Sequence, residues 1–83
     1  MKITPALQKL GLSEKEIRVY LAALSLGPSP VRKIALHADT NRGTTYDILK
    51  KLITLGLISY YHREKHQYFV AENPEKLIDV IAL

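Results

Sequence analysis

The sequence has no cysteine and no long apolar run. Without cysteine it has no disulfide and no thiolate metal site, which favours a reducing compartment. Its first residues, Met1 to Pro5, lack the apolar stretch of roughly 7 to 15 residues that a signal peptide needs. The longest apolar run elsewhere, Val19 to Leu24, falls far short of the ~20 residues of a membrane span. We therefore expect a soluble, cytoplasmic protein with no membrane partner.

Patterns typical of enzymes and metal sites are also missing. No nucleophile stands with a plausible base, and the four glycines are scattered singles rather than a phosphate-binding loop. His62 and His66 have the spacing of a zinc pair on a helix, but we place them on a hairpin without paired carboxylates. The sequence predicts no enzyme, no cofactor and no metal, in a single small domain over residues 1–83.

Positive charge is concentrated in the middle of the chain. The formal net charge is +4. Between Val31 and Lys65 seven basic residues stand against three acidic ones, whereas the rest of the chain has five of each. The whole excess therefore falls on one segment. Such a local excess is typical of a surface that binds a phosphate backbone.

The first third of the chain carries clear helix signals. A short helix is predicted over Pro5–Leu10. Ser13 and Glu16 match a capping box, in which each side chain bonds to the backbone amide of the other residue. The helix that they begin is expected to run from residue 14 to about residue 26, where Gly27 ends it.

A helix-turn-helix is predicted over about residues 30–55. Ser29 is expected to be the N-cap and Pro30 to occupy the first helical position. The two turns of helix that follow are expected over residues 31–38. The polar turn Asp39–Asn41 can cap the helix that follows. Two short helices joined by such a turn form the helix-turn-helix motif.

The second helix of this motif has two distinct faces. Its apolar positions recur at three- and four-residue steps and form one buried stripe: Thr45, Ile48, Leu49, Leu52 and Leu55. Gly56 follows and can adopt the left-handed conformation that ends a helix. The other face is formed by Gly43, Thr44, Asp47, Lys50, Lys51 and Thr54. Its exposed first turn carries Arg42 and small hydroxyl residues, which suit base edges and phosphates.

Two residues of this helix leave alternatives open. Tyr46 either contacts a base or phosphate, or its ring lies across the helix junction. Asp47 disfavours nearby phosphates, unless it pairs with a basic neighbour or accepts a hydrogen bond from a cytosine amino group.

A β-hairpin, or wing, is predicted over about residues 57–71. Leu57–Tyr61 and Gln67–Ala71 are aromatic and β-branched segments, separated by the charged segment His62–His66. Arg63, Lys65 and the two flanking histidines, His62 and His66, either contact the minor groove and its phosphates or belong to a solvated turn.

A last helix is predicted over about residues 74–83, capped by Asn73. Its apolar residues surround the helix axis: Leu77, Ile78, Val80, Ile81 and Leu83. Packing one side onto the domain leaves the other exposed, so we expect these residues to form a homodimer contact. The alternative is a truncated helix that packs on a domain missing from this chain.

The order of these elements resembles a known family. The resemblance lies in Leu10-Gly11-Leu12-Ser13 with Glu16 and Val19-Tyr20, in Leu24 and Gly27, in Tyr46-Asp47-Ile48-Leu49 with Leu52, and in Gly56-Leu57-Ile58. Over roughly residues 7–78 the chain resembles the N-terminal winged-helix domain of TrmB-like transcriptional regulators. The resemblance implies sequence-specific binding of double-stranded DNA, usually as a homodimer. By position it implies DNA contacts at Asn41, Arg42, Thr44, Tyr46 and Lys50, and at Arg63 and Lys65; the exposed helix face adds Lys51.

TrmB-like regulators commonly continue into a sugar-binding domain, whereas this chain stops at Leu83. The sequence therefore does not support a sugar effector, and the effector ligand is left unknown. We interpret the chain as a stand-alone regulator or a fragment of a longer one. The predicted fold is mainly α with a small β-hairpin, a winged helix-turn-helix. Its recognition helix is expected in the major groove and its wing on the adjacent backbone or minor groove. The alternative is a winged-helix protein-interaction module of the transcription machinery.

Overall fold

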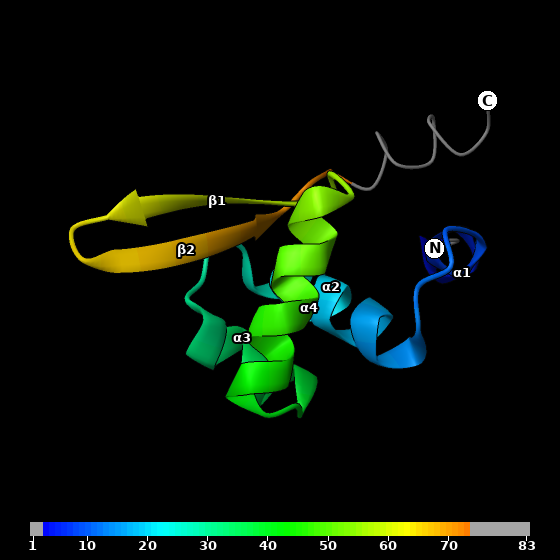
Figure 1. Ribbon diagram of the computed structural model, residues 1–83, viewed down its shortest axis with the longest axis horizontal. Helices are drawn as coiled ribbons and strands as arrows, with labels where there is room; N and C mark the ends of the chain where they lie inside the picture. Colours follow the sequence, from blue (N-terminus) through cyan, green and yellow to red (C-terminus); the bar gives the residue numbers. More distant parts are fainter. Residues whose placement is uncertain (1–2, 74–83) are drawn as a thin grey trace.

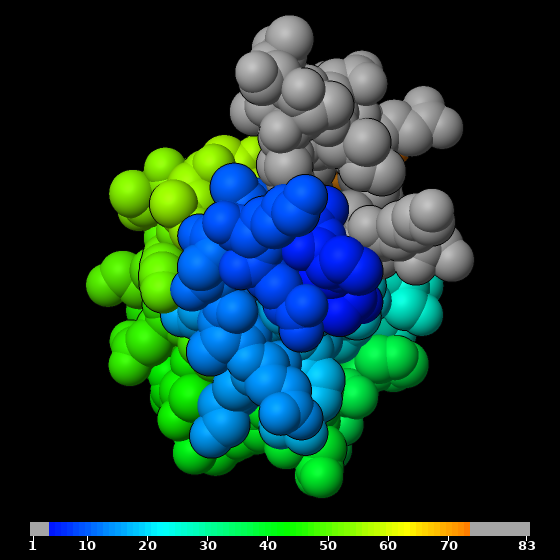
Figure 2. All heavy atoms as spheres, turned by 90° about the vertical axis from the view of Figure 1, so that its right-hand side faces the viewer, coloured from blue at the N-terminus to red at the C-terminus, as the bar shows by residue number. Residues whose placement is uncertain are grey.

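The structure, a computed structural model, describes residues 3–73. In this range four helices precede one antiparallel hairpin: α1 (Ile3–Lys9), α2 (Glu14–Leu26), α3 (Val31–Ala38), α4 (Arg42–Thr54), β1 (Ile58–Arg63) and β2 (His66–Ala71). The hairpin projects to one side of the helices (Figure 1). Figure 2 shows the opposite end, where α1 and the start of α2 fill the middle of the surface. The predicted mainly α fold with a small β-hairpin is confirmed.

Helix α2 begins with the predicted capping box. The Ser13 hydroxyl accepts a hydrogen bond from the Glu16 amide at 3.2 Å, and the Ser13 amide donates to Glu16 Oε1 at 2.8 Å. Gly27, with φ 74°, follows the last turn, and its amide donates to the Ala23 carbonyl. The expected bounds of this helix, residues 14 to 26, are therefore confirmed.

The start of α3 differs from the prediction. Pro30, rather than Ser29, occupies the N-cap position, and no side chain caps the helix. Ser29 instead pairs with β2: its amide donates to the Phe69 carbonyl at 3.2 Å and its carbonyl accepts from the Phe69 amide at 2.8 Å. The Ser29 hydroxyl donates to the Gly27 carbonyl at 3.0 Å. A serine that looks like a local cap is thus a tertiary contact to the wing.

Helix α4 buries most of the predicted stripe. Thr45, Leu49 and Leu52 are fully buried and Ile48 nearly so. The prediction that Leu55 belongs to this buried stripe is wrong, because Leu55 follows the last turn and is 49% exposed. Beyond it Gly56 has φ 81°, and the amides of residues 56 and 57 donate to the carbonyls of residues 53 and 52. This is the Schellman pattern, which ends the helix and turns Leu57 into the core.

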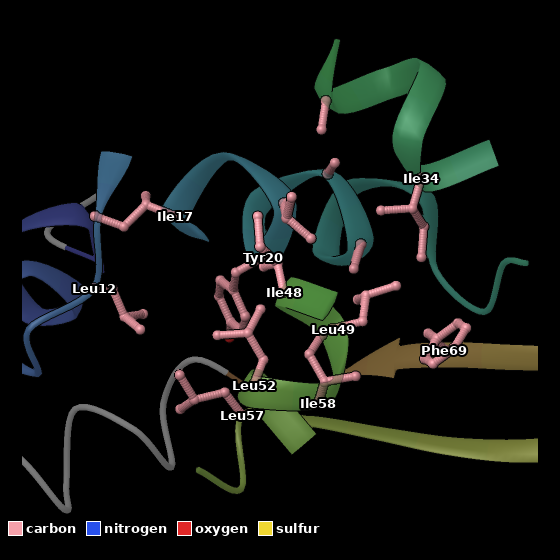
Figure 3. Close-up of a cluster of buried hydrophobic side chains, with 14 of the residues drawn as sticks. Leu12, Ile17, Tyr20, Ile34, Ile48, Leu49, Leu52, Leu57, Ile58 and Phe69 are labelled. Atoms are coloured by element: carbon pink, nitrogen blue, oxygen red, sulfur yellow. The ribbon is translucent and has the colours of Figure 1, made fainter. Parts of the chain in front are cut away.

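The core lies between α2, α3, α4 and the root of the wing (Figure 3). Tyr20 of α2 is fully buried beside Leu52 of α4, and its hydroxyl donates to the Glu72 carbonyl at 2.8 Å. Burial and, to a smaller extent, the charge of Glu72 raise the pKa of Tyr20 to about 12. The Glu72 amide donates to the Leu57 carbonyl at 2.9 Å. The first bond joins the root of the wing to α2, and the second joins the two ends of the wing to each other.

The wing spans residues 58–71, close to the predicted range, but its strands are longer than predicted and its turn is shorter. Residues 58–63 pair with residues 71–66 in register, so that Arg63 lies opposite His66. Only Glu64, with φ 60°, and Lys65 form the turn. His62 and Arg63 therefore belong to β1 and His66 to β2, because the ladder continues through polar residues that a composition pattern assigns to a loop. The predicted helix over 74–83 lies outside the described residues.

Candidate nucleic-acid interface

The first turn of α4 separates a capped, buried side from an exposed one. Asn41 Oδ1 accepts a hydrogen bond from the Thr44 amide at 2.7 Å, so the Asn41 side chain is the N-cap of this helix. The Thr45 hydroxyl donates to the Asn41 carbonyl at 2.8 Å and is buried. Arg42 and Gly43 are exposed on the other side of the same turn. Of the predicted contact residues here, Arg42 is free to reach a ligand and Asn41 also has a structural role.

Tyr46 lies between α4 and the wing. Its ring meets the Phe69 ring edge-on, with centroids 6.4 Å apart and planes at 81°. Lys50, one turn further along, places its ammonium 5.6 Å from the centroid of the Tyr46 ring, in cation–π range. Tyr46 nevertheless keeps 40% of its surface exposed. The ring therefore does lie across the junction between helix and wing, and its outer edge remains open to a ligand.

Lys51 points away from these residues. Its ammonium lies 2.7 Å from Glu16 Oε2, on α2. This hydrogen bond is the largest of the causes that hold the pKa of Glu16 below its usual value; the Ser13 amide is the second. A surface pair of this kind contributes only about 0–1 kcal/mol to stability. The pair matters here because it directs the Lys51 ammonium toward α2, whereas the Lys50 ammonium lies near Tyr46.

The two basic residues of the wing also face different surroundings. Lys65 lines a groove between the wing and the first turn of α4. Arg63 lines a separate hollow with Pro28, Tyr61 and Tyr68. The rings of Tyr61 and Tyr68 stack there, with centroids 5.5 Å apart and planes at 12°. The structure thus brings Lys65, but not Arg63, toward the recognition helix.

We call the first hollow the wing groove; it is lined by Pro30, Val31, Arg42, Gly43, Tyr46, Lys65, His66, Gln67 and Phe69. Its volume of about 530 Å³ lies within the roughly 300–1,000 Å³ typical of ligand-binding clefts. Apolar side chains form part of its wall, while Arg42 and Lys65 supply positive charge. The groove therefore suits an anionic ligand that spans helix and wing.

A second hollow, the α3 hollow, adjoins the wing groove and shares four of its residues. It is lined by Pro30, Val31, Arg32, Lys33, Leu36, Arg42 and His66. The sequence predicted His66 as either a wing-tip contact or a solvated turn residue, and it predicted neither Arg32 nor Lys33 as a contact. Arg32 and Lys33 do lie in the segment that holds the excess charge, and that signal pointed to them. The place of His66 beside α3 and α4 required knowledge of the fold, because only the wing brings it there.

Two further predictions concern the dimer contact and membrane spans. The predicted dimer residues Leu77, Ile78, Val80 and Ile81 lie outside the described residues. Within residues 3–73, no helix is both long enough and apolar enough to cross a membrane.

Comparison with solved structures confirms the winged helix-turn-helix fold. The crystal structure of NadR in complex with 4-hydroxyphenylacetate is similar with a TM-score of 0.73 and 19% identity, covering 98% of this chain and 60% of that one. MepR, a transcription regulator of the Staphylococcus aureus multidrug efflux pump MepA, gives a TM-score of 0.65 and 21% identity, covering 96% and 64%. At such identities the likeness concerns the fold alone.

Sequence comparison identifies the family. The chain is 31% identical over 80 residues to the HTH-type sugar sensing transcriptional regulator TrmBL1 of Pyrococcus furiosus, a match that covers 96% of this chain. It spans only 23% of that relative's length. This relative is a transcriptional regulator, which supports the prediction that the chain is not an enzyme. The family described as "Sugar-specific transcriptional regulator TrmB" matches residues 7–75. Because this match runs through most of the chain, the protein belongs to the TrmB family, as its sequence pattern predicted.

Proposed function

We propose that this chain binds double-stranded DNA in a sequence-specific manner as part of a transcriptional regulator. Helix α4 would enter the major groove, and the wing would contact the adjacent backbone or minor groove. One observation carries the proposal: Arg42 and Tyr46 of α4 and Lys65 of the wing line the same groove, in the segment that holds the excess positive charge. Family membership supports DNA as the partner.

The exposed turns of α4 would supply both kinds of DNA contact. Arg42 has the donor geometry for a guanine edge or a phosphate, and Lys50 carries a point charge that suits a phosphate. The Lys50 ammonium is held near the Tyr46 ring. The Thr44 amide donates its hydrogen bond to the Asn41 cap, and the Thr44 hydroxyl would contact DNA. Arg63 lines the other side of the wing, and we place it at the edge of the interface.

Adjacent lysines on α4 offer a matched test of this docking face. We expect Lys50→Ala to reduce the slope of log affinity against log salt by about 1, because each phosphate contact releases counterions. Lys51→Ala removes the same charge one position away, where the ammonium bonds to Glu16, and is expected to leave the slope unchanged. Fluorescence anisotropy of a labelled duplex at several salt concentrations measures both.

The same titrations address the competing function. If the two lysine variants change the slope equally, the proposed face of α4 is wrong. Wild-type affinity for duplex DNA should fall steeply with salt. A chain that binds no duplex, and instead binds a protein of the transcription machinery with little salt dependence, would be the interaction module.

The homodimer is a second part of the proposal. It is supported by the apolar pattern of residues 77–83 and by the small size of the domain, which buries only roughly 60–65% of its unfolded surface alone. A two-fold dimer would place two α4 helices about 34–36 Å apart on a palindromic site. Sedimentation equilibrium at micromolar concentration is expected to give twice the monomer mass. A monomer that binds half-sites as well as palindromes would exclude the dimer.

A further inference from the structure

His66 occupies a position that the proposed contacts leave unused. It is the first residue of β2 and is exposed. It lines both the wing groove and the α3 hollow, and Arg42 does the same. His62, four residues earlier in β1, lines neither; its ring lies 6.0 Å from that of Tyr60. Of these two histidines, only His66 lines the groove that holds Arg42, Tyr46 and Lys65.

The charges that face His66 are predominantly positive. Helix α3 contributes Arg32 and Lys33, α4 contributes Arg42, and the wing turn contributes Lys65. Across the hairpin, Arg63 is its register partner. Neither hollow is lined by an acidic residue; Glu64 of the wing turn lines the separate hollow with Arg63. A ligand that reaches His66 is therefore drawn there by its negative charge.

From this arrangement we propose that His66 is a phosphate contact that is protonated in the DNA complex, so that binding of duplex DNA takes up a proton. The inference rests on the proposed function. A neutral imidazole offers one N–H donor and no charge, whereas the imidazolium offers two donors and a full positive charge. Phosphates in the two hollows would bind the imidazolium more tightly than the neutral ring. By linkage, affinity then increases as pH falls through the range in which histidines titrate.

The test is a pH series at constant ionic strength, with anisotropy of a labelled 24-base-pair duplex of mixed sequence. Wild-type affinity is expected to increase about threefold to tenfold between pH 8 and pH 5.5, and by no more than about tenfold per pH unit for one proton. His66→Gln should flatten this dependence and match wild type near pH 8. His62→Gln is the control and should keep the wild-type profile. Circular dichroism at each pH checks that the variants stay folded.

The outcomes separate this inference from the proposed function. A chain that binds the duplex with an affinity independent of pH, or a His66→Gln variant that keeps the full pH dependence, overturns the role of His66 and leaves DNA binding intact. Equal flattening by His62→Gln overturns it as well, because the effect would then not be specific to the two hollows. A folded wild-type chain that binds no duplex at any pH would overturn both the role of His66 and the proposed DNA-binding function.

Discussion

Phe69→Ala is expected to lower the free energy of unfolding by about 3–5 kcal/mol, the usual cost of removing a buried aromatic ring. Phe69 is 1% exposed, and its ring meets those of Tyr46 and Tyr60 at centroid distances of 6.4 and 6.5 Å. Its backbone pairs with Tyr60 on one side and with Ser29 on the other. The substitution therefore leaves a cavity where the wing, α4 and the start of α3 meet.

Chemical denaturation followed by circular dichroism measures this effect. A domain of this size has a total stability of roughly 4–12 kcal/mol, so the variant should lose a large part of it. Tyr61→Ala is the control, since it also removes a ring stacked on a neighbour, but from a side chain that is 42% exposed. We expect that variant to lose about 1 kcal/mol. If the two variants were equally stable, Phe69 would not be the residue that joins wing and helices.

The elements that the sequence predicts well are those specified by neighbours in the chain. The capping box at Ser13 and Glu16 lies within one turn, and the stripe of α4 follows from helical spacing. The turn at Gly56 needs only a left-handed residue after the last turn. Local chemistry decides each of these cases, so that the fold class and most helix ends follow from pattern.

Two predictions fail where strand pairing, rather than the local pattern, decides the structure. Ser29 has the residue type and position of a helix cap. Its backbone instead pairs with that of Phe69, forty residues later in the chain. His62, Arg63 and His66 look like loop residues but continue the ladder, because the register fixed by buried residues extends past them. Tertiary pairing overrides local preference in both places.

The candidate site shows the same division. Charge placement alone assigns the proposed interface to the helix-turn-helix and wing, but it does not distinguish Lys50 from Lys51. Successive residues of a helix differ by about 100° in direction, and only the packed structure shows that Lys51 meets Glu16 on α2. The same holds for Arg63 and Lys65, whose opposite surroundings appear only once the hairpin is seated on α3 and α4.

Arg42→Ala is expected to weaken DNA binding by about 1–3 kcal/mol, roughly 5- to 150-fold in affinity, while the melting temperature stays unchanged. Arg42 is exposed, lies outside the core and lines both the wing groove and the α3 hollow. If it holds a guanine edge, preference at one base position should relax; if it holds a phosphate, all duplexes should weaken alike. Selection of bound sequences from a randomised duplex pool distinguishes the two.

Arg18→Ala is the matched control for this variant. Arg18 is an exposed arginine on α2 that lines neither hollow, so its removal changes the net charge by the same amount without touching the proposed interface. We expect its affinity to differ from wild type by less than about twofold at physiological salt, because salt screens an exposed charge that makes no direct contact with a phosphate. An Arg42→Ala variant that binds as tightly as Arg18→Ala would show that the wing groove is not where DNA binds.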